Sequence, residues 1–128
     1  MNDTTSNRAV AEAFSRHRFT ETYDHLAPDV TWLASGGSDT VGRDAVIAAC
    51  DSSADELARM STELLTVRVV AEGDTVVVET VGRYSEQEEE SFVASVDLYD
   101  FVDGALTRIV SYAVEIEDPR DGDSNGGR

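Results

Sequence analysis

The sequence predicts an α+β domain in which three N-terminal helices pack on one face of a strongly curved, mainly antiparallel sheet. Two observations carry this prediction. Apolar residues recur at helical spacing through most of the first 60 residues, and from Thr62 onward they alternate with polar residues as in strands. Helices followed by a run of strands are typical of the α+β class. With 128 residues, the chain is expected to form one domain that can bury a core.

The first half of the chain predicts three helices and one short strand. The second predicted helix ends at Pro28, because the residue before a proline is biased away from helical geometry. The third is predicted either continuous or broken at residues 51–53. The predicted elements are a helix from about residue 5 to 18, a short helix over 19–26, a strand over 29–35, a turn at 36–38 and a helix over 43–60.

The second half predicts four long antiparallel strands joined by hairpin turns. Gly73 and Asp74 predict one turn, the acidic run EQEEE a second and longer one, and Asp103 and Gly104 a third. The strands are expected over 62–72, 75–85, 91–102 and 105–117. Residues 1–118 therefore form the predicted domain, and the acidic, glycine-rich residues 119–128 form a tail that is predicted to be disordered.

The charge of the chain excludes two classes of partner. It carries 26 acidic and 10 basic residues, a net charge of −16, and every basic residue is arginine. Such a chain has no basic stripe for nucleic acid and is repelled by anionic membranes. The N-terminus shows no apolar signal segment, and no run reaches the roughly 20 apolar residues of a membrane span, so a cytoplasmic location is expected. Cys50 alone excludes an internal disulfide and is predicted to be a buried, unreactive thiol.

Asp97 is the residue that the strand pattern does not explain. It lies between Val96 and Leu98 in the stretch VDLYDFVDGALTRIVSY, so it faces either water or a pocket. Alternation puts it on one face with a mixed, partly aromatic set that suits a pocket wall. Buried there, Asp97 would be a usable acid or base; the alternative is a solvated or arginine-paired carboxylate. The residues predicted to share its face are Val93, Ser95, Tyr99 and Phe101.

Five pieces of the sequence, in this order, resemble the nuclear transport factor 2-like superfamily and its SnoaL-like and ketosteroid-isomerase-like members. The pieces are AVAEAF, LAPDVTWLASGG, VGRDAVIAA, VVAEGDTVVVE and VDLYDFVDGALTRIVSY, which together cover about residues 8–117. The resemblance implies a cone-shaped fold with a pocket at its mouth for a small hydrophobic molecule. It also implies a homodimer formed through the outer face of the sheet, for which Val77 and Val81 are suitably apolar.

The ketosteroid-isomerase-like pattern is only partly present. Phe14 stands where that pattern has an oxyanion-hole tyrosine, and Ala34 or Ser35 where it has a carboxylate base. Asp97 matches the third element, the strand acid; ketosteroid isomerase is itself the standard example of such an acid kept neutral. Steroid-type enolisation is therefore disfavoured.

SnoaL-like cyclases use a strand aspartate as acid/base, and Asp97 is the candidate for that role. The epoxide hydrolases of the superfamily use an Asp-Arg-Asp set. Arg83 or Arg108 is the candidate arginine, Val114 is predicted to occupy the place of the second aspartate, and Glu115 is predicted to project to the opposite face. The epoxide-hydrolase set is thus incomplete.

Further candidates come from aromatic and histidine residues. Tyr112 on the last strand is predicted to reach a ligand or Asp97 across the hairpin, as a second catalytic group. The predicted substrate-binding residues are Phe14, Trp32, Tyr99 and His25, with core packing as the alternative for Trp32. His17 is interpreted as a surface or helix-end residue. No metal-ligand or phosphate-binding motif occurs, so neither metal nor cofactor is expected.

Two functions remain open from the sequence. The first is a cofactor-independent enzyme that isomerises, cyclises, dehydrates or hydrates a hydrophobic carbonyl compound, with Asp97 as its acid/base. The second is a non-catalytic ligand-binding or dimerisation module of the same fold. The sequence names neither a substrate nor a reaction.

Overall fold

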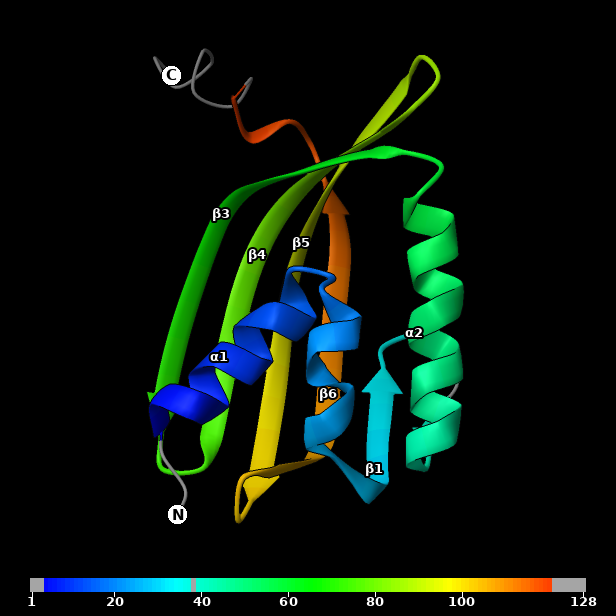
Figure 1. Ribbon diagram of the computed structural model, residues 1–128. Coiled ribbons are helices and arrows are strands. Elements are labelled where there is room, and N and C mark those ends of the chain that lie inside the picture. The colour runs from blue at the N-terminus through cyan, green and yellow to red at the C-terminus, as the bar shows by residue number, and fades with distance from the viewer. Residues whose placement is uncertain (1–3, 38, 121–128) are drawn as a thin grey trace.

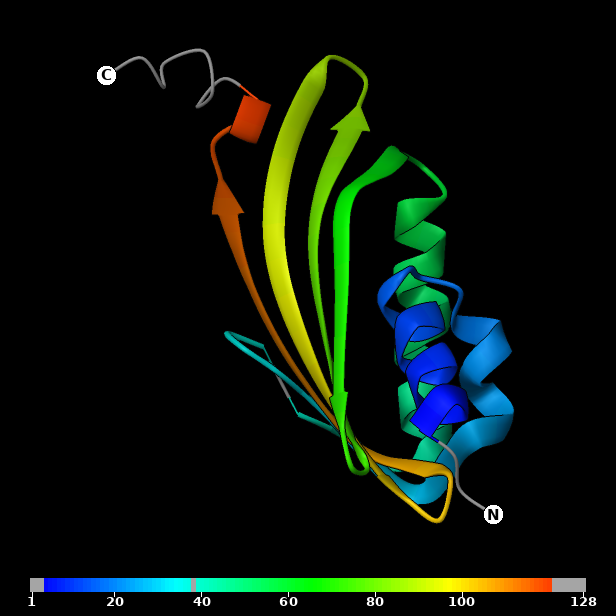
Figure 2. The ribbon, with the colours of Figure 1, turned by 90° about the vertical axis from the view of Figure 1, so that its left-hand side faces the viewer.

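The computed structural model describes residues 4–37 and 39–120 and has the predicted architecture, with all helices on the inner face of one curved sheet (Figures 1 and 2). The helical elements are α1 (Thr4–Ser15), the 3-10 helix η1 (Phe19–His25) and α2 (Arg43–Leu57). The strands are β1 (Leu26–Ala34), β2 (Thr40–Val41), β3 (Ser61–Glu72), β4 (Thr75–Glu86), β5 (Glu89–Val102) and β6 (Ala105–Ile116).

The six strands form one sheet in the order β2-β1-β6-β5-β4-β3. The four long strands of the second half are sequential antiparallel neighbours, as predicted, and β1 joins them parallel to β6. Figure 2 shows the sheet bending toward the helices, which all lie on its inner side. The prediction of an α+β cone with three helices on a curved, mainly antiparallel sheet is confirmed.

Several predicted boundaries were wrong, for identifiable reasons. Strand β1 begins at Leu26 and contains Pro28, which is tolerated because strand pairing is irregular between Leu26 and Thr31. Helix α2 is continuous through residues 51–53, one of the two alternatives, but it ends at Leu57 instead of residue 60, and the two-residue strand β2 was not foreseen. The acidic run is a tight turn instead of a long one, because β4 and β5 extend into it and leave only Gln87 and Glu88 between them, with Gln87 in a left-handed conformation at φ 58°.

The core lies between α1 and the inner face of the sheet at the narrow end of the cone. Phe14 of α1 is its centre, with ring centroids 5.1 Å from Phe19, 5.1 Å from Trp32 and 5.8 Å from Tyr99, all in edge-on geometry. Such pairs add directional stabilisation to apolar burial. Cys50 is fully buried, as predicted, and burial raises the pKa of its thiol to about 12.

The predicted tail, residues 119–128, falls largely outside the described residues. Of its first two positions, Arg120 bonds the carboxylate of Asp118 and lies 5.4 Å from the ring centroid of Phe92. None of the helices in residues 4–37 and 39–120 is long and apolar enough to cross a membrane.

Candidate functional site

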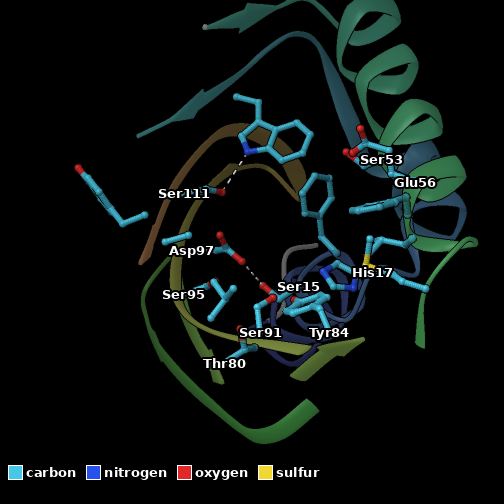
Figure 3. Close-up of a pocket in the computed structure, with 18 residues that line it drawn as sticks. Ser15, His17, Ser53, Glu56, Thr80, Tyr84, Ser91, Ser95, Asp97 and Ser111 are labelled. Atoms are coloured by element: carbon cyan, nitrogen blue, oxygen red, sulfur yellow. Dashed lines mark hydrogen bonds between the residues drawn. The ribbon is translucent and has the colours of Figure 1, made fainter. Parts of the chain in front are cut away.

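A pocket of about 460 Å³ opens between the inner face of the sheet, the end of α1 and the last turns of α2. Its size is in the range of small-molecule sites. Figure 3 shows its polar side chains converging from both layers. The apolar and aromatic lining residues are Phe14, Phe19, Trp32, Leu57, Met60, Tyr84, Val93, Tyr112 and Ala113, and the polar lining residues are Ser15, His17, Ser53, Glu56, Thr80, Ser91, Ser95, Asp97 and Ser111.

Asp97 lies in the pocket wall, half-buried, as the pocket interpretation of the sequence predicted. Its Oδ2 atom accepts a hydrogen bond of 2.8 Å from the Ser15 hydroxyl at the last residue of α1. The Tyr99 hydroxyl also approaches Oδ2, at the longer distance of 3.4 Å. Both contacts go to one oxygen, which leaves Oδ1 without a hydrogen-bond partner among the described residues. One carboxylate oxygen is therefore anchored and the other is available to a ligand.

Tyr99, in the core next to the pocket, supports the hydrogen bond between Ser15 and Asp97. Its side chain is fully buried, and its hydroxyl lies 2.5 Å from the Ser15 hydroxyl. Since the Ser15 proton is directed to Asp97, the Tyr99 hydroxyl is the donor to Ser15. Burial, and secondly the charge of Asp97, raise the pKa of Tyr99 well above its ordinary value, so it stays protonated. The predicted role of Tyr99 as a substrate-contacting wall is therefore corrected: it belongs to the core beneath the site.

His17 lies at the end of α1, in agreement with its interpretation as a surface or helix-end residue, but it also lines the pocket, which that interpretation did not include. The helix ends with hydrogen bonds from His17 N to Phe14 O and from Arg18 N to Ala13 O, the pattern of a Schellman motif. His17 occupies its left-handed position, with φ 68°. Histidine is enriched among non-glycine residues that adopt this conformation, and that was the only sequence signal.

The environment of His17 keeps its imidazole neutral. Desolvation by burial lowers the pKa of His17, and the nearby charge of Asp97 opposes the effect without cancelling it. The ring centroid lies 5.8 Å from Phe19 and 6.3 Å from Tyr84. A neutral imidazole beside the pocket can accept or donate one hydrogen bond but adds no positive charge.

Trp32 and Ser111 form the wall next to Asp97. The strand pairing sets Asp97 of β5 directly opposite Ser111 of β6. The indole N–H of Trp32 donates to the Ser111 hydroxyl at 3.0 Å, so both alternatives for Trp32, core packing and pocket lining, hold together. Because its oxygen accepts from Trp32, the Ser111 hydroxyl can direct its own proton toward a ligand.

Tyr112 does not take the place predicted for it. An extra residue in β6 shifts the strand register between Asp100 and Phe101, and the Thr107 hydroxyl donates to the Asp100 carbonyl at 3.0 Å beside this bulge. A one-residue shift exchanges the faces of every following side chain. Tyr112 therefore lies opposite Val96, on the opposite face of the sheet from Asp97, and is 54% exposed, although it still belongs to the pocket lining.

The same shift corrects the predicted epoxide-hydrolase positions. Val114 is 61% exposed on the outer face, and Glu115 lies on the inner side, in a recess next to the pocket. Neither candidate arginine lines the pocket: Arg83 pairs with Glu63 and Glu90, and Arg108 pairs with Asp100.

Two further expectations concern His25 and metal binding. His25 is the last residue of η1, is half-buried and is not among the pocket-lining residues, so it does not line the mouth as expected. Within residues 4–37 and 39–120, no group of three or more His, Cys, Asp and Glu side chains is arranged to hold a metal ion.

Tyr84 forms the outer wall of the pocket because Gly82 leaves it room. A Cβ atom at Gly82 would lie 2.9 Å from Cε1 and 3.0 Å from the hydroxyl oxygen of Tyr84, closer than real contacts allow. The tyrosine ring therefore folds back along the strand over the glycine. Burial, and then the charge of Asp97, raise the pKa of Tyr84, so its hydroxyl remains a donor at neutral pH.

The structure thus brings Asp97, Phe14 and Trp32 together, as predicted, and adds Ser15, His17, Tyr84 and Ser111. A carboxylate with one open oxygen, surrounded by hydroxyl donors and aromatic walls, can transfer a proton to or from a ligand without a metal.

Comparison with known proteins identifies one matching family and many solved structures that have a similar fold. The family model for the SnoaL-like domain matches residues 7–109. No curated protein matches the sequence significantly.

Three solved structures illustrate the structural similarity. An NTF2-like protein of unknown function from Cytophaga hutchinsonii has a TM-score of 0.79 at 24% identity, covering 88% of this chain and all of the other. A candidate polyketide cyclase from Xanthomonas campestris has a TM-score of 0.69 at 19% identity, with 94% and 96% coverage. A Mycobacterium tuberculosis LEH-like epoxide hydrolase has a TM-score of 0.66 at 19% identity, with 88% and 86% coverage. At these identities the similarity shows the fold alone.

Proposed function

The chain belongs to the SnoaL-like domain family, and we propose that it is a cofactor-independent enzyme acting on a hydrophobic carbonyl compound. The reaction is an isomerisation, cyclisation, dehydration or hydration that begins with proton transfer. One observation carries the proposal: Asp97 stands in the pocket wall with Oδ2 bonded to Ser15 and Oδ1 open to the cavity.

The proposed chemistry uses Oδ1 of Asp97 as the base. It removes a proton from the carbon next to the ligand carbonyl, and the electron pair of that C–H bond moves toward the carbonyl oxygen. The developing negative charge is stabilised by hydrogen-bond donors in the pocket, for which Ser111 beside Asp97 and the protonated Tyr84 are the candidates. Protonated Asp97 then returns the proton at the same or another carbon. Ser111 replaces Tyr112, the donor expected from the sequence.

The similar structures named as a cyclase and an epoxide hydrolase support small-molecule chemistry in such a cone. Between these two, carbonyl chemistry fits this pocket better. The Asp-Arg-Asp arrangement needs an arginine beside the aspartate, and none of the residues that line this pocket is an arginine.

Hydrogen exchange tests the proposal with a panel of model compounds and does not require the natural substrate. The protein is incubated in D₂O with hydrophobic ketones and esters, and deuterium uptake next to the carbonyl is followed by mass spectrometry. Asp97→Asn should lose at least about 100-fold in exchange rate, the lower range for a general base. Asp103→Asn is the matched control, since Asp103 is an exposed turn residue with φ 51° that asparagine also tolerates. Equal exchange by wild type and Asp97→Asn would remove Asp97 from the mechanism.

A second function, a non-catalytic binding module, is favoured by one observation. Phe14 stands where the ketosteroid-isomerase-like pattern has its oxyanion-hole tyrosine. Its side chain lines the cavity with an aromatic ring but has no hydroxyl group to donate a hydrogen bond. Under this alternative the same carbonyl compounds bind, as measured by a shift in the melting temperature, but neither exchange nor product formation follows.

We also propose that two chains associate through the outer face of the sheet. Neighbouring strands bring apolar side chains together there, and Tyr112 and Val114 are more than half exposed. Monomeric soluble proteins rarely leave such a continuous apolar surface open. This surface, the outer apolar patch, consists of Val77, Val81, Ala94, Val96, Leu98, Val110, Tyr112 and Val114.

A further inference from the structure

The charges that line the pocket are all of one sign. Asp97 on β5 and Glu56 on α2 contribute carboxylates from opposite walls, as Figure 3 shows. None of the residues that line the pocket is an arginine, and the chain contains no lysine. His17 also lines the pocket, but burial lowers its pKa, and so it adds no positive charge at neutral pH.

Two arginines on elements that line the site are paired elsewhere, and Arg59, which precedes Met60, is exposed and does not line the pocket. Arg16 bonds Glu12 at 2.8 Å on the outer side of α1, and Arg83 bonds Glu90 at 2.8 Å and Glu63 at 3.2 Å. Their charges are balanced by carboxylates outside the cavity. The two carboxylates that line the cavity have no arginine partner among the described residues.

The approach to the pocket extends the same sign of charge. A recess beside the pocket shares Met60, Tyr84 and Ser91 with it. Its other lining residues are Glu86, Glu89, Glu90 and Glu115. Glu90 pairs with Arg83 at 2.8 Å, whereas Glu86, Glu89 and Glu115 have no arginine partner among the described residues, so the recess adds negative charge beside the pocket.

We propose that the pocket selects ligands by charge, favouring a cationic group near Glu56, accepting neutral compounds and rejecting anions. Glu56 is an exposed residue of the pocket lining and Asp97 is a half-buried one, so an anionic ligand meets two like charges as it enters. An ammonium group meets the same charges as partners, and the aromatic walls, Phe14 and Trp32 among them, also attract cations. The inference rests on the proposed ligand-binding role of the pocket and adds a substrate class to it: an amine-bearing or uncharged apolar skeleton.

Three probe compounds of similar shape test the expected order of affinities. Naphthylmethylammonium, naphthylmethanol and naphthoate differ mainly in charge, and their binding to the wild-type protein is measured by calorimetry at neutral pH and low salt. We expect naphthylmethylammonium to bind most tightly and naphthoate about tenfold more weakly than the alcohol, because the carboxylate of naphthoate is repelled by the half-buried Asp97 and by Glu56. Added salt should narrow the gap, because it screens the exposed carboxylates.

Variants assign the effect to Glu56. Glu56→Gln should narrow the affinity ratio of ammonium to carboxylate several-fold. Glu72→Gln removes the same charge from an exposed position at the hairpin at the far end of β3, and should preserve the ratio. If the affinity ratio of ammonium to carboxylate falls equally in both variants, the selection comes from the net charge of the chain, and the role of Glu56 is overturned.

The outcomes separate this inference from the proposed function. If naphthoate binds as tightly as the alcohol, selection by charge is wrong while the pocket stands. If none of the three probes binds, the ligand-binding role falls, and the inference falls with it. If the expected order of affinities is seen in the wild type, weakened in Glu56→Gln and kept in Glu72→Gln, the result supports both the charge selection and the proposed ligand-binding role.

Discussion

The hydroxyl of Ser15 lies 2.8 Å from Oδ2 of Asp97 and joins the end of the first helix to the centre of the sheet. Behind Ser15, the buried Tyr99 hydroxyl completes a chain of donors that ends on the carboxylate. Because both donors approach one oxygen, the carboxylate group has a fixed orientation. This hydrogen-bond chain also ties α1 to β5, so it serves both the site and the fold.

Ser15→Ala should weaken the protein by about 1–3 kcal/mol, because it removes the nearer partner of the buried Tyr99 hydroxyl and leaves only the 3.4 Å contact with Asp97. Urea unfolding measures the change. Ser52→Ala in the exposed part of α2 is the matched control and should change stability little. If the two substitutions cost the same, the Ser15 hydroxyl is not coupled to the buried tyrosine.

Tyr99→Phe tests whether the donors act as one unit. Alone, it removes a hydroxyl that has two partners, Ser15 and Asp97. Combined with Ser15→Ala, it should cost less than the sum of the two single changes, by about 0.5–3 kcal/mol, since contacting residues are not additive. The four free energies of unfolding from urea titrations give this coupling directly, and strict additivity would contradict it.

His17 should make the stability of the protein depend on pH in a predictable direction. Burial lowers its pKa in the folded state below the ordinary value of about 6.5, while Asp97 opposes the shift and Tyr84 lies beside the ring. The unfolded chain therefore binds the proton more readily. Stability from this group is complete above about pH 6.5 and is lost as the pH falls from there toward the lowered pKa.

His17→Asn removes this contribution and keeps a residue that tolerates the left-handed conformation. Between about pH 7 and about pH 5, the urea midpoint of the wild type should fall more than that of the variant. All other titrating groups are common to both proteins, so the difference between the two slopes isolates His17. Parallel slopes would show that burial does not shift its titration.

How much of this site the sequence could predict depends on the kind of signal that each residue left. Asp97 was found because a carboxylate interrupts an alternating strand, and Phe14 and Trp32 because they are large and apolar at periodic positions. The wrong face of Tyr112 has a single cause. A plain two-residue hairpin would set Tyr112 on the face of Asp97, whereas the bulge near Thr107 reverses it. The sequence around Thr107 carries no recognisable bulge signal.

Ser15 and His17 could not be predicted for a different reason. Both lie at the end of α1, where helical periodicity no longer says which way a side chain points. Their direction depends on the chain reversal at His17 and on where the helix sits against the sheet. These are tertiary facts, whereas the order of helices and strands follows from local patterns and was correct except for the short strand β2.

Gly82→Ala should alter ligand binding with little change in stability. The new Cβ would meet the mobile end of the Tyr84 side chain, at 2.9 Å from Cε1, so the ring moves and the outer pocket wall moves with it. We expect the affinity for a pocket ligand to change several-fold while the free energy of unfolding changes by about 1 kcal/mol or less. Gly37→Ala is the control, since its Cβ meets only Ala34 atoms at an ordinary 3.7 Å. Unchanged affinity in Gly82→Ala would show that Tyr84 does not shape the cavity.

Tyr112→Glu should separate the proposed dimer. Tyr112 is 54% exposed and lies inside the outer apolar patch, opposite Val96 and next to Val110 and Val114. A two-fold dimer contains each substitution twice, so one charge per chain places two in the interface. We expect the dissociation constant to rise by about tenfold or more, as for a central aromatic residue of an interface. Light scattering across a dilution series measures the dissociation constant, and circular dichroism checks that the fold is kept.

Val102→Glu is the control for this prediction. It places the same charge on a residue of similar exposure, 58%, at the far end of β5, and should leave the dimer intact. A wild-type protein that is monomeric at every concentration would overturn the proposal, and a dimer that survives Tyr112→Glu would move the interface to another surface.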